Sequence, residues 1–296
     1  MKPARPHNLR HRLRTAVARE ALRRSGPILD QTIIALDYPP NAINVPRYAP
    51  STPQAKLAEL VRAGEARYRR TLATIGDYAE DLAEIELRGA DATQPYLLNR
   101  FLPGLDGAAL YGLLRARAPE RYIEVGSGTS TKFAHRAKAD GGLRTTITSI
   151  DPSPRTSINA LCDEVLRVPL ESLDLSVWAS LESGDMIFVD GSHRVFMNND
   201  VVAFFLDVLP SLPAGVLVGV HDVYLPYDYP REIAERYYSE QYVLAAYLLG
   251  GAPVEVMLPA HYVFLNMRAE LDALWARSAR FAEIEHHGVA FWLQTR

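Results

Sequence analysis

Residues 122–128 read YIEVGSG, a run with three apolar side chains that closes on two glycines around a serine. A short apolar run that ends on glycine is typical of a buried strand followed by a sharp turn. Similar runs are TTITSID (145–151), DEVLRVPL (163–170), DMIFVDG (185–191) and GVLVGVHD (215–222). Segments of helical length separate most of them, which predicts an α/β fold with a parallel sheet covered on both faces.

Three more strands are expected near the C-terminus, with the last as a hairpin-type addition to the sheet edge. They are VEVMLP (254–259), HYVFLN (261–266) and GVAFWLQ (288–294).

Upstream of the sheet, apolar residues between 54 and 87 recur at intervals of three, four or seven, which predicts one long amphipathic helix or two short ones. The apolar stripe needs a partner, either the main domain or a second subunit, so a homo-oligomer through these helices is one expectation. Five prolines in residues 37–53 predict an extended connector. The expected organisation is a basic leader and connector (1–53), a helical extension (54–94) and a catalytic domain (95–296).

Composition narrows the protein class. With 296 residues and 48% apolar content, the chain can bury a substantial core. The formal charge of −3 is uneven, because residues 1–24 hold eight Lys or Arg against Glu20 alone and the remainder is strongly acidic. We therefore expect no nucleic-acid partner for the main body. No transmembrane segment or secretory signal is evident, and the single cysteine, Cys162, has no internal partner, so a cytoplasmic location is expected.

Every strand of the central run is followed by acids or imidazoles. Ligands of such sheets bind beyond the carboxyl ends of the strands, where the strand order reverses. A single polar residue at a strand end commonly just meets solvent, but five in succession indicate a site. The residues are Glu124, Asp151, Glu171, Asp190 with His193, and His221 with Asp222.

The first turn indicates the kind of ligand. Gly126 and Gly128 allow a tight turn, and Ser130 or Thr131 can cap the next helix. A dinucleotide-binding turn has a third glycine where Thr131 stands, and Glu124 would oppose a pyrophosphate. Asp151, which closes the second strand, suits a ribose. The ligand is expected to be a nucleoside with a positively charged tail.

These segments resemble the class I S-adenosylmethionine-dependent methyltransferases, in the subgroup with metal-dependent small-molecule O-methyltransferases. The resemblance covers about residues 95–296 and rests on RYIEVGSGTSTKFA, SID, FVDGSH and HDV. It implies a Rossmann-like, seven-stranded, mostly parallel sheet and S-adenosylmethionine as cofactor. The cofactor-binding residues that it implies, together with the helix cap, are Glu124, Gly126, Ser127, Gly128, Ser130, Asp151, Glu171, Ser172 and Asp190.

The acceptor's proton must be removed. A histidine with a pKa of about 6.5 is poorly matched to a hydroxyl near 15.7, a gap of about 12 kcal/mol. A divalent cation held by Asp190, Asp222 and His221 would lower that cost while His193 accepts the proton. The histidine shifts the expected ion from Mg²⁺ towards Mn²⁺, Fe²⁺ or Zn²⁺, or argues against a metal. Without a metal, His193 or His221 acts as base and an aspartate orients it; His221 alternatively satisfies a buried carbonyl.

A tyrosine-rich stretch follows the fifth strand. Tyr224, Tyr227 and Tyr229 are expected to cover a small-molecule acceptor, because a tyrosine ring offers an apolar face and a polar rim. Tyr237, Tyr238 and Tyr247 are as readily explained by helix packing.

The most economical hypothesis is O-methylation of a small molecule, such as a sugar or a natural-product intermediate. Two alternatives remain: an NAD-dependent oxidoreductase, which would have no use for Glu124, and a non-catalytic binding module that retains the cofactor fold.

Overall fold

The computed structural model describes residues 17, 20, 21, 24, 45–89, 91–154 and 157–296. The chain divides into two units, Met1–Ile43 and Asn44–Arg296. In the first unit, the four described residues are helical and exposed, and the other residues of the expected leader lie outside the described residues. In the second unit, residues 45–53 form bends and turns, whereas the sequence predicted an extended connector.

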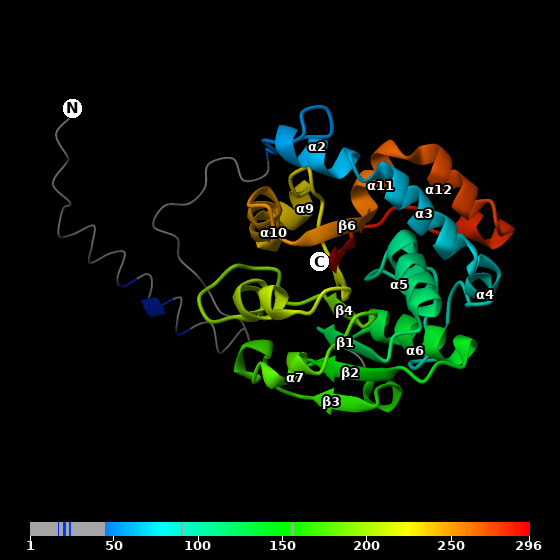
Figure 1. Ribbon diagram of the computed structural model, residues 1–296, viewed down its shortest axis with the longest axis horizontal. Coiled ribbons are helices and arrows are strands. Elements are labelled where there is room, and N and C mark those ends of the chain that lie inside the picture. The colour runs from blue at the N-terminus through cyan, green and yellow to red at the C-terminus, as the bar shows by residue number, and fades with distance from the viewer. Residues whose placement is uncertain (1–16, 18–19, 22–23, 25–44, 90, 155–156) are drawn as a thin grey trace. The chain divides into compact units, whose positions relative to one another are not determined.

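The helices and strands of the second unit alternate over most of its length (Figure 1). The strands are β1 (Arg121–Val125), β2 (Thr146–Ile150), β3 (Glu164–Leu166), β4 (Met186–Val189), β5 (Leu217–Val220), β6 (Val254–Pro259) and β7 (Phe291–Thr295). The α-helices are α2 (Ala55–Arg62), α3 (Glu65–Gly76), α4 (Ala79–Ala83), α5 (Gly104–Arg117), α6 (Thr129–Gly141), α7 (Ser176–Ala179), α8 (Asp200–Ala203), α9 (Arg231–Ala234), α10 (Glu240–Leu249), α11 (Ala260–Asn266) and α12 (Arg268–Trp275). A π-helical segment, Phe204–Val208, continues α8, and short 3₁₀ segments are Asn159–Leu161, Leu170–Ser172, Leu209–Ser211 and Ala279–Glu283.

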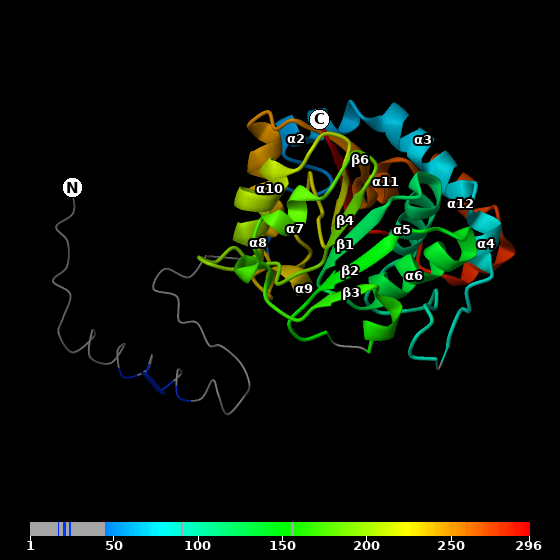
Figure 2. The same cartoon turned by 60° about the horizontal axis from the view of Figure 1, so that its bottom comes forward.

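The seven strands form one sheet in the order β3-β2-β1-β4-β5-β7-β6. All neighbouring pairs from β3 to β5 are parallel, and β7 runs antiparallel to both β5 and β6. Figure 2 shows α5 and α6 on one side of the sheet and α7, α8 and α10 on the other. The expected Rossmann-like, mostly parallel sheet is confirmed, and its order reverses between β1 and β4.

The central strands are apolar because both faces of the sheet are covered. Every residue of β4 and β5 is buried. Gly219 in β5 has a packing role, since a Cβ at this position would come within 2.7 Å of Phe188 and 2.8 Å of Trp292. The missing side chain lets these two large rings pack at 5.5 Å between centroids.

The apolar stripe of the N-terminal helices packs within the same chain. Three helices, α2, α3 and α4, replace the one or two that were expected. Val61, Tyr68 and Ile75 are at most 1% exposed and belong to the core cluster that includes the sheet. This stripe therefore packs against its own chain, and a homo-oligomer through these helices stays a prediction.

Two sequence predictions near the C-terminus are wrong. Residues 261–266 belong to α11 rather than to a strand, because the chain turns at Pro259 and a helix then buries Tyr262 and Val263. Short apolar runs do not distinguish strand from buried helix by periodicity alone. The final strand, β7, is inserted between β5 and β6, so β6 forms the edge of the sheet.

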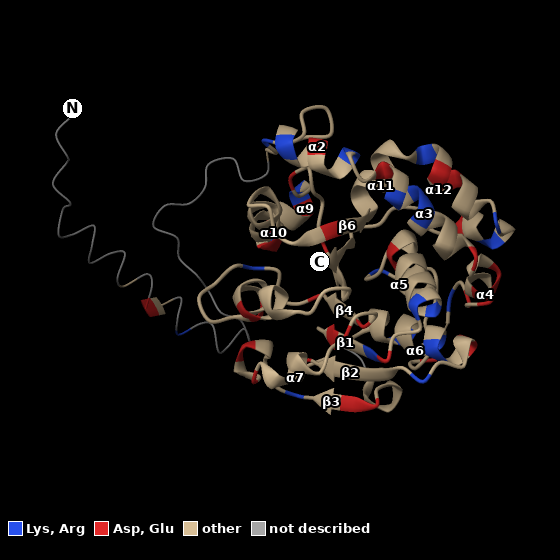
Figure 3. Ribbon diagram, in the orientation of Figure 1, with Lys and Arg blue, Asp and Glu red and all other residues tan. Residues whose placement is uncertain are grey.

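Basic and acidic side chains are interspersed on the described surface. Figure 3 shows Lys and Arg next to Asp and Glu on helices such as α3 and α12. Within the described ranges, none of the helices has the length and apolar character needed to span a bilayer.

Candidate active site

A cavity of about 1210 Å³ opens at the carboxyl ends of β1, β2, β4 and β5. This is the edge at which parallel sheets bind ligands, beside the reversal of strand order. Its wall includes the residues that follow each of these strands, in the ranges 125–129, 150–153, 190–194 and 221–222. The sequence prediction of a site built from these four strand ends is therefore met in the geometry.

The turn after β1 approaches the next strand closely. Gly126 has a φ of 78°, and a Cβ there would lie 1.9 Å from the carbonyl oxygen of Asp190. No other residue type fits this position without moving the backbone. A Cβ at Gly128 would meet no described atom within 4 Å, so that position borders open space. The turn thus presents bare backbone to the cavity.

Glu124 lies behind this turn and does not line the cavity. Its carboxylate is fully buried and accepts hydrogen bonds from the hydroxyls of Tyr122 and Thr131. Thr131 in turn accepts a hydrogen bond of 3.0 Å from the Gly128 amide. Burial raises the pKa of Glu124 to about 7, although the hydroxyl donors oppose the shift. The carboxylate holds the turn through Thr131, and a contact between Glu124 and the ligand stays a prediction.

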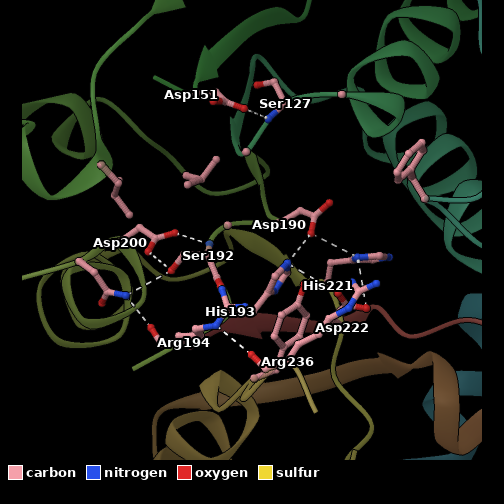
Figure 4. A pocket seen from close by; sticks show the side chains of 18 of the residues that line it. Ser127, Asp151, Asp190, Ser192, His193, Arg194, Asp200, His221, Asp222 and Arg236 are labelled. Carbon is pink, nitrogen blue, oxygen red and sulfur yellow. Dashed lines mark hydrogen bonds and ion pairs between the residues drawn. The ribbon is translucent and has the colours of Figure 1, made fainter. Parts of the chain in front are cut away.

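Asp151 closes β2 and organises the neighbouring backbone. Its two carboxylate oxygens accept hydrogen bonds of 2.8 Å from the amides of Ser127 and Ser153. Each oxygen keeps a second lone pair, and the side chain lines the cavity. Ser127 and Asp151 therefore mark one end of the cavity, as Figure 4 shows.

Of the other residues expected to bind the cofactor, some line the cavity and others do not. Glu171 lines the cavity, as predicted. Ser130 is 3% exposed inside the first turn of α6 and does not reach the wall. Ser172 also lies off the wall, and its hydroxyl donates to the carbonyl of Pro169. Of the two possible helix caps, Thr131 bonds the Gly128 amide.

Asp190, His193 and Asp222 meet at the centre of the cavity and are called here the acid–histidine cluster. The Nε2 atom of His193 lies 3.2 Å from Asp190 Oδ1 and 3.6 Å from Asp222 Oδ2. One ligand atom from each side chain lies within 4.8 Å of the other two. The sequence placed His221 in the cation set. In the structure His193 joins the two carboxylates, and His221 Nδ1 also lies 3.4 Å from Asp190 and 3.9 Å from Asp222.

The backbone of the cluster is unusual. His193 and Asp222 have φ angles of 62° and 54°, in the left-handed region that non-glycine residues seldom adopt. Such a conformation costs about 1–2 kcal/mol per residue. Strain of this kind persists where the surrounding structure fixes it, and it concentrates at functional sites.

Glu240, which the sequence did not single out, fixes His193 from behind. Its carboxylate is 1% exposed and contacts His193 Nδ1. The backbone amides of Ser239 and Glu240 also donate to the His193 carbonyl. Glu240 begins α10, 47 residues further along the chain, and no local spacing in the sequence indicates this contact.

His221 lies one layer deeper and faces Asp106, a second residue that sequence reasoning missed. Asp106 on α5 is fully buried, lies 3.3 Å from His221 Nε2, and accepts hydrogen bonds from the amides of Val289 and Ala290. His221 Nδ1 is 3.4 Å from Asp190. The alternative in which His221 satisfies a buried carbonyl is not supported, because carboxylates surround the ring.

The carboxylates dominate the electrostatics of the two imidazoles. Burial alone would lower the pKa of His193, but Glu240 and Asp190 outweigh it and hold the pKa well above 6.5. For His221, burial is likewise outweighed, chiefly by Asp190 and Asp106, so its pKa is also raised. Conversely, burial would raise the pKa of Asp190, but His221 and His193 hold it well below its usual value.

The structure separates the three tyrosines that the sequence assigned to the acceptor. Tyr224 lines the cavity. Tyr227 and Tyr229 are only 5% and 4% exposed and lie off the wall, because their hydroxyls accept hydrogen bonds from Asn266 and the Gln241 amide. Tyr238, which sequence reasoning left to helix packing, lines the cavity and stacks on His193 at 4.4 Å between ring centroids.

Comparison with known families gives one match. Residues 123–223, about a third of the chain, match the family model described as a methyltransferase domain. The match spans β1 to the end of β5 and includes the whole acid–histidine cluster. It supports a methyltransferase domain in this part of the chain. No curated protein matches the chain.

Several solved structures are similar at low identity. The methyltransferase PaMTH1 of Podospora anserina, with SAH bound, is 16% identical, with a TM-score of 0.36 over 75% of this chain and 93% of that one. Cofactor-bound Rv0187 from MTB is 15% identical, with a TM-score of 0.37 over 76% and 88%. The plantazolicin methyltransferase BpumL, in complex with SAH, is 11% identical, with a TM-score of 0.36 over 83% and 91%. Similarity this low carries no weight for function.

Proposed function

We propose that this protein transfers a methyl group from S-adenosylmethionine to a hydroxyl oxygen of a small molecule. The observation that carries the proposal is the acid–histidine cluster, which stands at the centre of a strand-end cavity within the segment that matches a methyltransferase domain. The cavity volume of about 1210 Å³ exceeds the roughly 300–1,000 Å³ usual for one small-molecule site. A donor and an acceptor can therefore be held together.

The cofactor fits the end of the cavity marked by Ser127 and Asp151. The bare turn at Gly126 and Gly128 permits close approach of a ligand to the backbone, and Asp151 keeps free lone pairs for the ribose hydroxyls. Glu171 lines the same cavity, and the adenine would lie beside it. Glu124 acts indirectly in this proposal, because it fixes the turn through Thr131 and does not itself line the cavity.

The cluster also fits a divalent cation. Two carboxylates and one imidazole offer ligand atoms close together, and Glu240 behind His193 forms the carboxylate–histidine arrangement common around metal sites. Together with Asp106 and His221, the centre holds four carboxylates and two imidazoles, so it stays negative even with both rings protonated. When bound, a cation would lower the pKa of the acceptor hydroxyl.

This geometry changes the proposed role of His193. An imidazole whose pKa is raised by flanking carboxylates is protonated near neutral pH and cannot accept another proton. If a cation binds, the Nε2 proton would have to leave, and neutral His193 would then offer Nε2 to the cation while Nδ1–H stays with Glu240. Methyl transfer is an in-line displacement in which a carbon–sulfur bond breaks and a carbon–oxygen bond forms. The hydroxyl proton is released to solvent water.

Cofactor binding is tested by titrating the full chain with SAH and, in parallel, with NAD⁺, using calorimetry. We expect SAH to bind and NAD⁺ not to bind. Asp151→Asn should lower the affinity for SAH about 10- to 100-fold, because hydrogen bonds to a charged group contribute about 1.5–3 kcal/mol. Asp174→Asn, an exposed aspartate off the cavity, is the matched control. Binding of NAD⁺ with no binding of SAH would reject the proposal in favour of an oxidoreductase.

The cation is tested with Mn²⁺ and electron paramagnetic resonance. The full chain should bind Mn²⁺, Asp222→Asn should lose it, and Asp174→Asn should keep it. If no cation binds and SAH still does, the cation assignment fails, and the metal-free alternative stays, in which His193 or His221 is the base and an aspartate orients it.

A further inference from the structure

Two arginines of the cavity wall lie away from the end marked by Ser127 and Asp151, and Asp200, which also lines the wall, accepts hydrogen bonds from Ser192. Figure 4 shows Ser127 and Asp151 at one end, Arg194 and Arg236 at the other, and the acid–histidine cluster between them. If the cofactor occupies the Asp151 end, the two arginines face the acceptor. Their charges are therefore a direct indication of the acceptor's chemistry.

Arg194 is held in place without being neutralised. Its Nε donates to the carbonyl of Arg236 at 2.9 Å, and its Nη1 donates to the carbonyl of Ser192 at 3.2 Å. Carbonyl oxygens orient a guanidinium but carry no formal charge. Because a guanidinium has five N–H donors, three remain for a ligand.

Arg236 adds a second positive charge at the same place. Both guanidinium groups lie over the Tyr238 ring, at 5.3 Å for Arg194 and 5.9 Å for Arg236. Tyr238 itself stacks on His193, which links the arginine pair to the acid–histidine cluster. Neither arginine has a carboxylate partner among the residues that the structure describes.

Nearby arginines outside the cavity behave differently. Arg231, on α9 just before Arg236, pairs with Glu235 at 2.8 Å. Such a pair is the usual state of an exposed helix arginine. Arg194 and Arg236 line the cavity and lack such a partner, so their positive charge is available to a ligand.

We propose that the acceptor carries an anionic group, a carboxylate or a phosphate, which Arg194 and Arg236 bind while its hydroxyl lies at the acid–histidine cluster. This inference deepens the proposed function and rests on it. Paired arginines suit both anions because their planar N–H donors match two oxygens at once. The ring of Tyr238 offers an apolar face beside the anion, so an acceptor with an aromatic or other flat body suits the site.

The test uses three probes with one benzene ring each, titrated by NMR into the full chain saturated with SAH. Benzoate and phenyl phosphate are anionic, and benzyl alcohol is neutral. We expect at least one anion to bind about tenfold or more tightly than benzyl alcohol, and its affinity to fall as salt is raised. The tighter of the two anions identifies the group.

Variants then locate the effect. Arg194→Gln with Arg236→Gln should weaken the preferred anion about 10- to 100-fold, the loss expected for one charged hydrogen bond or more. Arg194→Lys with Arg236→Lys keeps both charges and should retain part of the affinity. Arg231→Gln, outside the cavity, should bind as the natural chain does. Thermal unfolding and SAH titration verify that each variant folds.

Two outcomes overturn the inference: equal binding of neutral and anionic probes, or an anion affinity that the double glutamine variant leaves unchanged. Either result with intact SAH binding rejects the anionic acceptor alone. Failure of the natural chain to bind SAH rejects the proposed function itself, and probe titrations without SAH still report on the arginine pair.

Discussion

Glu124 should make the stability of this protein fall as pH rises through neutrality. The carboxyl has a pKa of about 7 in the folded chain, against 4.5 when unperturbed, because burial penalises its charged form. Between these two values the folded protein keeps a proton that the unfolded chain releases, so unfolding is favoured as pH rises. A difference of about 2.5 pKa units corresponds to about 3 kcal/mol.

The substitution that tests this prediction is Glu124→Gln, because glutamine has nearly the same shape as glutamate but carries no titratable group. A protonated Glu124 and a glutamine each have one acceptor oxygen and one donor group facing Tyr122 and Thr131. The natural chain and the variant should therefore have similar free energies of unfolding at pH 4.5. At pH 8, the natural chain should have lost about 3 kcal/mol relative to the variant. Urea unfolding at the two pH values measures the difference.

Glu59→Gln is the control, because Glu59 is exposed on α2 and should show a pH profile parallel to that of the natural chain. Parallel profiles for the natural chain and Glu124→Gln would refute the reasoning, since they would mean that the buried carboxyl does not retain its proton. The same result would favour the original expectation that an ionised Glu124 interacts with the ligand.

Three other results are expected. Gly126→Ala should destabilise the fold by several kcal/mol and abolish SAH binding, because its Cβ would lie 1.9 Å from the Asp190 carbonyl oxygen; unchanged thermal unfolding would contradict this. Gly128→Ala should fold normally, since its Cβ meets no described atom within 4 Å, and a large loss of melting temperature would show that the turn is tighter than described. Glu240→Gln should lower the pKa of His193, which NMR titration measures. The same variant should lower the affinity for Mn²⁺ about 10- to 100-fold. An unchanged His193 pKa would mean that Glu240 does not support the ring.

The sequence located the site well wherever the site follows strand ends. Apolar runs that close on polar residues identified β1, β2, β4 and β5, and parallel pairing necessarily brings their carboxyl ends to one edge. Asp151, Asp190, His193 and Asp222 all line the cavity for this reason. By contrast, residues 261–266 were misassigned because a short apolar run fits a strand and a buried helix equally well.

What the sequence could not determine depends on side-chain direction and on distant contacts. Glu124 follows the strand pattern, yet it points inward to Tyr122 and Thr131 rather than into the cavity. Glu240 reaches His193 across 47 residues, a contact that only the packing of α10 creates.

The amino-acid sequence by itself indicated the central parallel strands and the strand ends that supply the chemistry, because strand periodicity and the rules of parallel sheets are local or topological. Only the tertiary structure decided that His193 and His221 both contact the two aspartates and that Tyr238 faces the cavity beside Tyr224. It also showed that neither Arg194 nor Arg236 has a carboxylate partner within the described part of the chain. These features depend on three-dimensional distances between segments that no spacing along the chain encodes.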